Sequence, residues 1–144
     1  MSKWDDRFME MAYLVSTWSK DPSTKVGAVI VDKDRRIISC GYNGAPKGVL
    51  EPSGFSREER LDRTIHAEAN ALHFAGDVRG CSMYITAAPC AHCAGHMIQR
   101  GITRIVYPKP NGDYSERWKE SLKVADLMFI ESGVKTIEVL TWKK

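Results

Sequence analysis

Residues 82–107 read SMYITAAPCAHCAGHMIQRGITRIVY, and this stretch decides the fold. Its first five and last four residues form short apolar runs that are typical of buried strands. Between them, 90–100 has the composition of a helix, and Gly101 suits the position after a helix end. Strands joined through a helix are parallel as a rule, so the stretch predicts an α/β sheet with helices packed on its faces.

The flanking sequence extends this unit in both directions. We predict one domain over 1–144, with a hairpin followed by alternating helices and strands, and hence a mixed sheet of five strands. A long polar segment at 43–63 is expected to be functional or mobile, and part of it, 56–61, suits a short helix with a serine cap. The expected elements are helices at 4–18, 64–75, 90–100 and 114–132 and strands at 26–31, 36–42, 82–86, 104–107 and 136–140.

Composition narrows the class of protein. Of the 144 residues, 43% are hydrophobic and 27% are charged, which is ordinary for a globular domain with its own core. No apolar run approaches the ~18–20 residues that cross a bilayer, and the N-terminus is acidic where a signal peptide is basic, so we expect a cytoplasmic protein without a membrane partner. The net charge of +3 suits a phosphorylated small molecule, although solvated lysines explain it equally well. Without a basic stripe, we expect no nucleic-acid partner.

The four cysteines divide into two kinds. Cys90 and Cys93 have the spacing of metal ligands. Cys40 and Cys81 each lie in apolar, strand-like sequence, and we interpret both as small buried hydrophobic residues. A disulfide framework does not suit a chain of this length without a secretion signal.

His66-Ala67-Glu68 and Pro89-Cys90-Ala91-His92-Cys93 carry the chemistry. His66, Cys90 and Cys93 supply three ligands for one zinc ion, and three protein ligands leave a fourth position for water, as in catalytic sites. The two cysteines begin a helix, whose positive end favours thiolate. Glu68 is left over to carry protons between water and substrate. No fourth ligand is evident, because His73, His92 and His96 are interpreted as surface or packing residues.

With these residues, three longer blocks carry a resemblance: 19–28, 41–48 and 66–72, which read SKDPSTKVGA, GYNGAPKG and HAEANAL. The chain resembles the cytidine deaminase-like superfamily and, within it, the deoxycytidylate (dCMP) deaminases. This resemblance implies a three-layer α-β-α fold around a five-stranded mixed sheet. It also implies zinc-dependent hydrolysis of dCMP to dUMP and ammonia.

The resemblance assigns roles to further residues. It implies that His66, Cys90 and Cys93 bind zinc, that Glu68 carries the proton and that the backbone N–H of Ala67 faces the pyrimidine carbonyl. Asn43 matches a position that contacts the deoxyribose or the base. Lys25 can meet the 5′-phosphate, with a solvated lysine as the even alternative. Tyr107 can line the pocket, with a core tyrosine as the equal alternative.

The family is typically hexameric, activated by dCTP and inhibited by dTTP, each bound with Mg²⁺. The implied regulatory residues are Asn43, Gly44 and Lys47, and glycine lets phosphates approach the backbone closely. Segment 49–65 lacks the cysteines and histidines that form a second zinc site in some members, so we predict one zinc per chain. Segment 108–113 and Asp77 also depart from the regulated members.

Two alternatives remain open. The first is another deaminase, acting on tRNA adenosine, guanine or free cytidine. Free cytidine deaminases usually carry cysteine at the position of His66, and a tRNA enzyme would have a basic surface and a short connection before that histidine. The second alternative is a non-catalytic binding module stabilised by zinc, against which Glu68 argues because an inert site does not need a carboxylate beside the metal.

Overall fold

The computed structural model describes residues 2–50, 54–110 and 112–139. Within them, five strands form one sheet in the order β2-β1-β3-β4-β5. The predicted elements are found, with ends shifted by a few residues, and the short helix within the polar segment is present and capped by the Ser56 side chain. The elements are α1 (Lys3–Ser16), β1 (Gly27–Val31), β2 (Ile37–Tyr42), α2 (Arg57–Arg63), α3 (Ala67–Phe74), β3 (Ser82–Ile85), α4 (Ala91–Gln99), β4 (Arg104–Pro108), α5 (Gly112–Ser132) and β5 (Lys135–Val139).

The sheet is mixed, as predicted. β1 lies antiparallel to both β2 and β3, whereas β3, β4 and β5 are parallel to one another. All five residues of β1 are buried, which fits its continuous apolar run and its position between two other strands. The predicted last residue of β5, Leu140, lies outside the described residues.

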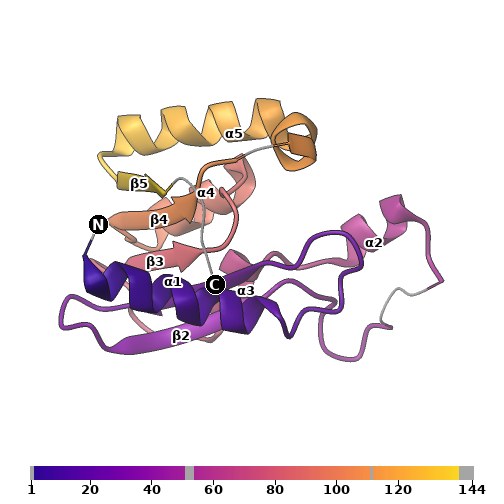
Figure 1. Ribbon diagram of the computed structural model, residues 1–144, viewed down its shortest axis with the longest axis horizontal. Helices are drawn as coiled ribbons and strands as arrows, with labels where there is room; N and C mark the ends of the chain where they lie inside the picture. Colours follow the sequence, from indigo (N-terminus) through magenta and orange to yellow (C-terminus); the bar gives the residue numbers. More distant parts are fainter. Residues whose placement is uncertain (1, 51–53, 111, 140–144) are drawn as a thin grey trace.

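Helices cover both faces of the sheet, which confirms the three-layer α-β-α architecture (Figure 1). On one face, α1 packs Phe8 and Met9 against Val29 and other side chains of the strands. On the other face, α3, α4 and α5 enclose a second apolar cluster around residues such as Met83. None of the helices in the described residues is both long and apolar enough to cross a lipid bilayer.

Two glycines let these helices approach the sheet very closely. A Cβ atom on Gly27 would lie 2.1 Å from the Ala12 carbonyl oxygen in α1. A Cβ atom on Gly41 would lie 2.5 Å from the Ala71 backbone nitrogen in α3. Side chains at these positions would push both helices outward, so glycine at position 41 sets the depth of the helix that begins next to His66.

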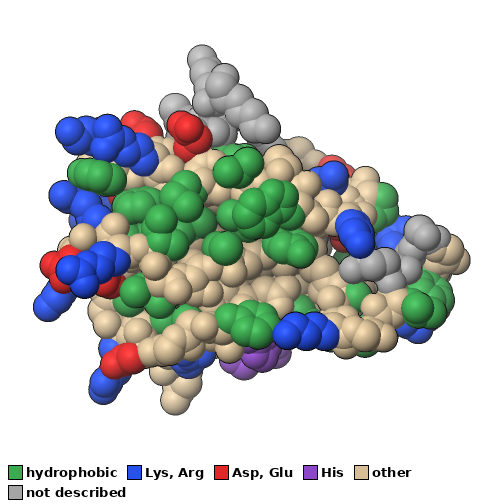
Figure 2. All heavy atoms as spheres, turned by 90° about the horizontal axis from the view of Figure 1, so that it is seen from below, with side chains coloured by type: hydrophobic (Ala, Val, Ile, Leu, Met, Phe, Trp, Pro, Cys, Tyr) green, Lys and Arg blue, Asp and Glu red, His purple; other side chains and the backbone are tan. Residues whose placement is uncertain are grey.

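The structure departs from the sequence predictions in two places near the edge strand β2. The first helix was predicted at 4–18, but α1 ends at Ser16 and Trp18 is 52% exposed. Cys40 is exposed because β2 is an edge strand, whereas Cys81 is buried as expected. Figure 2 shows apolar side chains gathered on the surface over α1 and β2. Trp18 and Tyr42 contact each other edge to face.

A buried ion pair joins the first helix to the sheet at the end remote from Gly41. The Arg104 guanidinium donates to both carboxylate oxygens of Asp5, at 2.9 and 2.7 Å, and the Tyr84 hydroxyl donates to the same carboxylate at 2.6 Å. Asp5 also closes a capping box with Ser2. Burial by itself raises the pKa of Asp5, but the hydrogen bonds from Arg104 and Tyr84 outweigh it and hold that pKa well below its usual range.

Replacing Asp5 with Asn should lower the free energy of unfolding at pH 7 by about 2 kcal/mol, because Arg104 loses its charged partner in a largely buried position. The depressed pKa of Asp5 stabilises the fold above about pH 4 and loses this effect as the pH falls further, since the unfolded chain then takes up the proton first. Denaturant unfolding of Asp5→Asn should therefore depend less steeply on pH in acid than unfolding of the wild type.

The exposed neighbour Asp6 provides the matched control. Asp6→Asn removes a charge from the same helix turn without breaking the ion pair, and it should cost only a few tenths of a kcal/mol. Equal losses in the two variants would contradict the role given to Asp5.

Candidate active site

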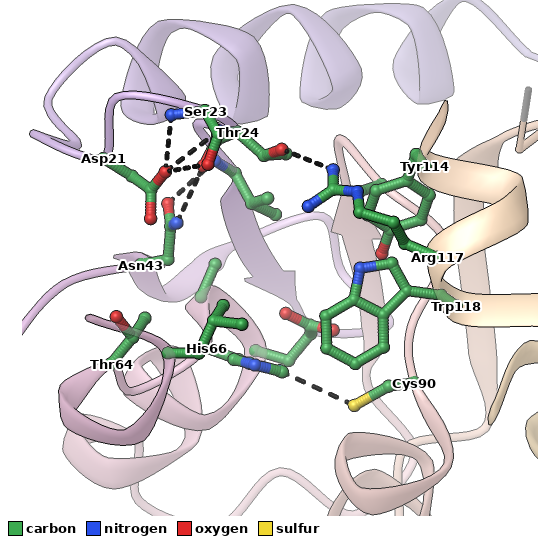
Figure 3. Close-up of a pocket in the computed structure, with 15 residues that line it drawn as sticks. Asp21, Ser23, Thr24, Asn43, Thr64, His66, Cys90, Tyr114, Arg117 and Trp118 are labelled. Atoms are coloured by element: carbon green, nitrogen blue, oxygen red, sulfur yellow. Dashed lines mark hydrogen bonds between the residues drawn. The ribbon is translucent and has the colours of Figure 1, made fainter. Parts of the chain in front are cut away.

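Three predicted metal ligands, His66, Cys90 and Cys93, meet at one point. Figure 3 shows two of them, His66 and Cys90, in the lining of a pocket. The Nδ1 atom of His66 lies 3.5 Å from Sγ of Cys90 and 3.4 Å from Sγ of Cys93. A tetrahedral ion with Zn–S of about 2.3 Å and Zn–N of about 2.0–2.1 Å separates its sulfur and nitrogen ligands by about 3.5 Å. The three side chains therefore fit zinc, with Nδ1 as the histidine ligand, and within the described residues this is the one such group of three or more.

The helices α3 and α4 both present their N-terminal ends to the point where the three ligands meet. His66 is the N-cap residue of α3 and Cys90 is the N-cap residue of α4, and neither side chain caps its own helix. Their side chains are thus available to a metal, while the positive ends of the helices favour thiolate. The hydrogen bond between the two cysteines favours one thiolate, because it lowers the pKa of Cys90 and raises the pKa of Cys93.

Glu68 lies in the first turn of α3, 4% exposed, and lines the pocket together with His66 and Cys90. Burial raises the pKa of Glu68 to about 7. A carboxyl group with a pKa near neutrality can both accept and donate a proton under cellular conditions. Its burial beside the metal ligands gives it the position that the sequence predicted for the proton carrier.

One face of α5 closes the other side of the site. The Tyr114 hydroxyl donates to the Ala88 carbonyl at 2.6 Å and so holds the turn before the first cysteine. Trp118 meets the His66 ring edge to face, with ring centroids 5.7 Å apart. The Ser121 hydroxyl accepts from the backbone N–H of Ala91 at 2.8 Å, at the first residue of α4.

These α5 residues were missed in the sequence, together with Arg117, which also lines the pocket. Positions 114, 117, 118 and 121 recur at steps of three and four, so the signal was a helical stripe of polar and aromatic residues. The stripe identifies one face of a helix but not what that face contacts.

The loop between α1 and β1 forms the outer wall of the pocket (Figure 3). Asp21 accepts hydrogen bonds from the backbone N–H groups of Ser23 and Thr24, at 2.8 and 3.0 Å. Asn43 braces the same loop, since its side chain accepts from the Val26 N–H at 2.8 Å and donates to the Thr24 carbonyl at 2.9 Å. Asn43 therefore shapes the pocket wall as well as lining it.

The remaining predicted residues take different positions. Ala67 is fully buried and lines the pocket, whereas Lys25 is exposed and is not among the lining residues. Tyr107 lies in the core cluster beneath α4 and α5, also apart from the lining residues, and burial raises its pKa to about 12. Gly44 pairs through its backbone with Ile65, next to the ligand His66.

Lys47, the third predicted regulatory residue, lies outside the pocket, with its ammonium group 5.4 Å from the centre of the Phe74 ring at the end of α3. The roles given to Lys25, Tyr107, Gly44 and Lys47 stay predictions.

Comparison with known proteins gives a consistent family. The family model described as "Cytidine and deoxycytidylate deaminase zinc-binding region" matches residues 2–109. An uncharacterized deaminase of Aliivibrio fischeri is 45% identical over 144 residues, which cover 99% of this chain and 95% of that protein. The deoxycytidylate deaminase of Mus musculus is 38% identical over 143 residues, covering 92% and 77% of the two chains.

Solved structures share the fold. The dCMP deaminase of cyanophage S-TIM5, in complex with dCMP and dUMP, superposes with a TM-score of 0.80 at 24% identity over 96% of this chain and 98% of its own. A structure from a study of tRNA:A34 deaminases superposes with a TM-score of 0.55 at 20% identity over 92% and 96%. The same fold thus occurs around different substrates, so it does not select one.

Ser121→Ala should weaken zinc binding by about tenfold, because the Ala91 N–H at the start of α4 loses its acceptor and the turn that carries the two cysteines loosens. Competition with a zinc chelator measures the affinity. Ser132→Ala is the matched control, since that hydroxyl bonds only within the far end of α5 and should leave zinc affinity unchanged. Equal affinity in Ser121→Ala and wild type would refute the positioning role.

Proposed function

This chain belongs to the cytidine and deoxycytidylate deaminase family, and from that premise we propose that it is a zinc-dependent enzyme that hydrolyses dCMP to dUMP and ammonia. One observation carries the proposal: the buried carboxyl group of Glu68 lies beside a three-ligand metal cluster at the base of a pocket. A purely structural zinc site would take a fourth protein ligand and would have no use for that carboxyl group.

Zinc held by His66, Cys90 and Cys93 would supply a water molecule of lowered pKa, whose oxygen forms the new bond to C4. Glu68 can then transfer one proton of that water to the ring nitrogen N3 and the second to the departing amino group. The C4–N bond breaks, a C4 carbonyl forms and ammonia leaves, so that both water protons are accounted for. The raised pKa of Glu68 suits a group that must hold a proton between these two transfers.

The start of α3 offers a contact for the base. The first N–H groups of a helix have no partner within the helix, and Ala67 is the first residue of α3. Its N–H can donate to the pyrimidine carbonyl without any side-chain movement. Trp118 and Tyr114 supply aromatic surface on the opposite side of the pocket (Figure 3).

Arg117 is our candidate for the contact to the 5′-phosphate. It is the one Lys or Arg among the described residues that line the pocket, and it donates to the Thr24 hydroxyl at 3.1 Å. A guanidinium group at this position can form two parallel hydrogen bonds to phosphate oxygens. We give this role to Arg117 in preference to Lys25, for which the sequence left a solvated lysine as an even alternative.

Glu68→Gln should lower kcat by about 10²–10⁴-fold while one zinc ion per chain is retained, because the amide keeps the shape of the carboxyl group but cannot carry the proton. Ammonia release from dCMP and metal analysis of the same preparation measure the two effects. Glu58→Gln, an exposed change in the first turn of α2, should leave both unchanged. Undiminished turnover in Glu68→Gln would refute the mechanism.

Arg117→Gln should raise the KM for dCMP by about tenfold or more, since a charge-assisted contact to the phosphate is lost, and should leave the KM for deoxycytidine unchanged. Lys25→Gln is the comparator and should change neither KM. A selective rise in the KM for dCMP in Lys25→Gln alone would assign the phosphate to Lys25 instead.

We also infer that dCTP activates and dTTP inhibits the enzyme, each bound with Mg²⁺ at Asn43, Gly44 and Lys47. The backbone contacts support a coupling to the active site. The Gly44 N–H donates to the Ile65 carbonyl at 3.1 Å, and the Gly44 carbonyl accepts from the Ile65 N–H at 2.9 Å, immediately before His66. An effector that moves this loop would move a zinc ligand with it.

Initial rates over a range of dCMP concentrations, with Mg²⁺ and with or without each effector, test this regulation. A sigmoidal curve that dCTP makes hyperbolic is expected. An unchanged curve with both effectors would refute the regulation and leave the catalytic proposal standing.

The same family relationship leads us to propose a homo-oligomer, with a hexamer favoured, in the cytoplasm. The exposed apolar side chains over α1 and β2, together with the free edge of β2, support contact with a second copy of the chain. The molar mass in solution, measured by light scattering, tests the number of copies.

A further inference from the structure

A second pair of metal-ligating side chains lies on α4, outside the active site. His92 and His96 are one helical turn apart and both are exposed. Their Nε2 atoms are 3.3 Å apart, whereas their ring centroids are 4.8 Å apart. The two rings therefore lean toward each other at their Nε2 tips.

The distance between the two nitrogens matches that of two ligands on one ion. Imidazole nitrogens lie about 2.0–2.1 Å from a divalent ion such as zinc, so two of them at a tetrahedral or octahedral angle are about 2.9–3.4 Å apart. The observed 3.3 Å falls in this range without a change of rotamer. The same distance is long for an N–H···N hydrogen bond, whose usual length is about 3.0 Å.

The pair is separate from the catalytic cluster. His92 lies between Cys90 and Cys93 in the sequence, but both cysteines are buried toward α3 while His92 faces outward. In the parts of the chain that the structure describes, the two imidazoles have no other hydrogen bond or ion pair. Both rings are thus available to an ion from solvent.

A neighbouring basic side chain, Arg100, is held by other contacts. Arg100 lines a small cavity next to His96, but its guanidinium group donates to the carbonyl oxygens of Leu72 and Gly76, at 2.9 and 2.7 Å. These contacts hold it against the end of α3, so that it does not cover the imidazole pair.

We propose that His92 and His96 form a peripheral site for a divalent transition-metal ion of the class that prefers imidazole: Cu²⁺, Ni²⁺ or Zn²⁺. Two protein ligands with water in the remaining positions bind more weakly than the three-ligand catalytic cluster. The site therefore fills when ions are supplied and empties with a mild chelator, and it adds to the one resident zinc. The bound ion links the first two turns of α4, the helix that begins at the zinc ligands.

Titration of the zinc-loaded, full-length protein with Ni²⁺ in a calorimeter tests this site. The wild type should take up one Ni²⁺ per chain, and His92→Gln and His96→Gln should each weaken that binding by about tenfold or more. The resident zinc, measured by metal analysis, should stay at one per chain in all proteins. Exposed substitutions of this kind leave the fold intact, which the melting temperature without Ni²⁺ checks.

His73→Gln is the matched control. His73 is an exposed histidine on α3 that lines the same cavity as His96 but does not belong to the pair. The Ni²⁺ affinity of the His73→Gln variant should equal that of the wild type. Wild-type affinity in both variants of the pair, or an equal loss in His73→Gln, would overturn the proposal. Neither result bears on the deaminase proposal, because the measurement follows Ni²⁺ and not turnover.

Discussion

The N-terminal ends of α3 and α4 must meet at one point, and the rest of the molecule is arranged around this constraint. Two positive helix ends repel each other unless negative charge lies between them. The thiolates of Cys90 and Cys93 can supply that charge, and a zinc ion bound to them would hold His66 to the same point. The metal ligands therefore determine how two helices of the same layer approach, as well as the chemistry of the pocket.

Contacts far from the metal ligands fix the positions of α3 and α4 relative to each other. Gly41 lets α3 lie directly on the edge strand β2, while Arg100 at the end of α4 donates to the carbonyl groups of Leu72 in α3 and of Gly76 just after it. Ser121 and Tyr114 of α5 hold the opposite end of α4 and the turn before it. Each helix is thus fixed at both ends, which is the rigidity that a preorganised catalytic group requires.

The two buried carboxyl groups, those of Asp5 and Glu68, serve stability and reactivity at different places along the sheet. Arg104 and Tyr84 donate hydrogen bonds to the buried carboxylate of Asp5. These contacts outweigh the effect of burial on its pKa, so Asp5 stays ionised and the ion pair stabilises the fold. At Glu68 burial outweighs the charge of His66 and the hydrogen bond with Cys93, and it raises the pKa of Glu68 to about 7. The two buried carboxyl groups thus differ in pKa because only Asp5 accepts two hydrogen bonds from a guanidinium group.

The residue types and their periodicity were sufficient to predict much of this structure. The order of strands and helices follows from residue periodicity, and the three candidate zinc ligands and Glu68 stand in two short motifs, at 66–68 and 89–93. Three features depended on contacts between distant segments. The helix α5 reaches the site because the connection that it forms between β4 and β5 lies over α4. Cys40 is exposed because β2 is an edge strand of the sheet. The proximity of Arg117 to Thr24 joins residues 93 positions apart. A linear pattern reveals which face of an element is distinct, but only the tertiary structure decides what that face meets.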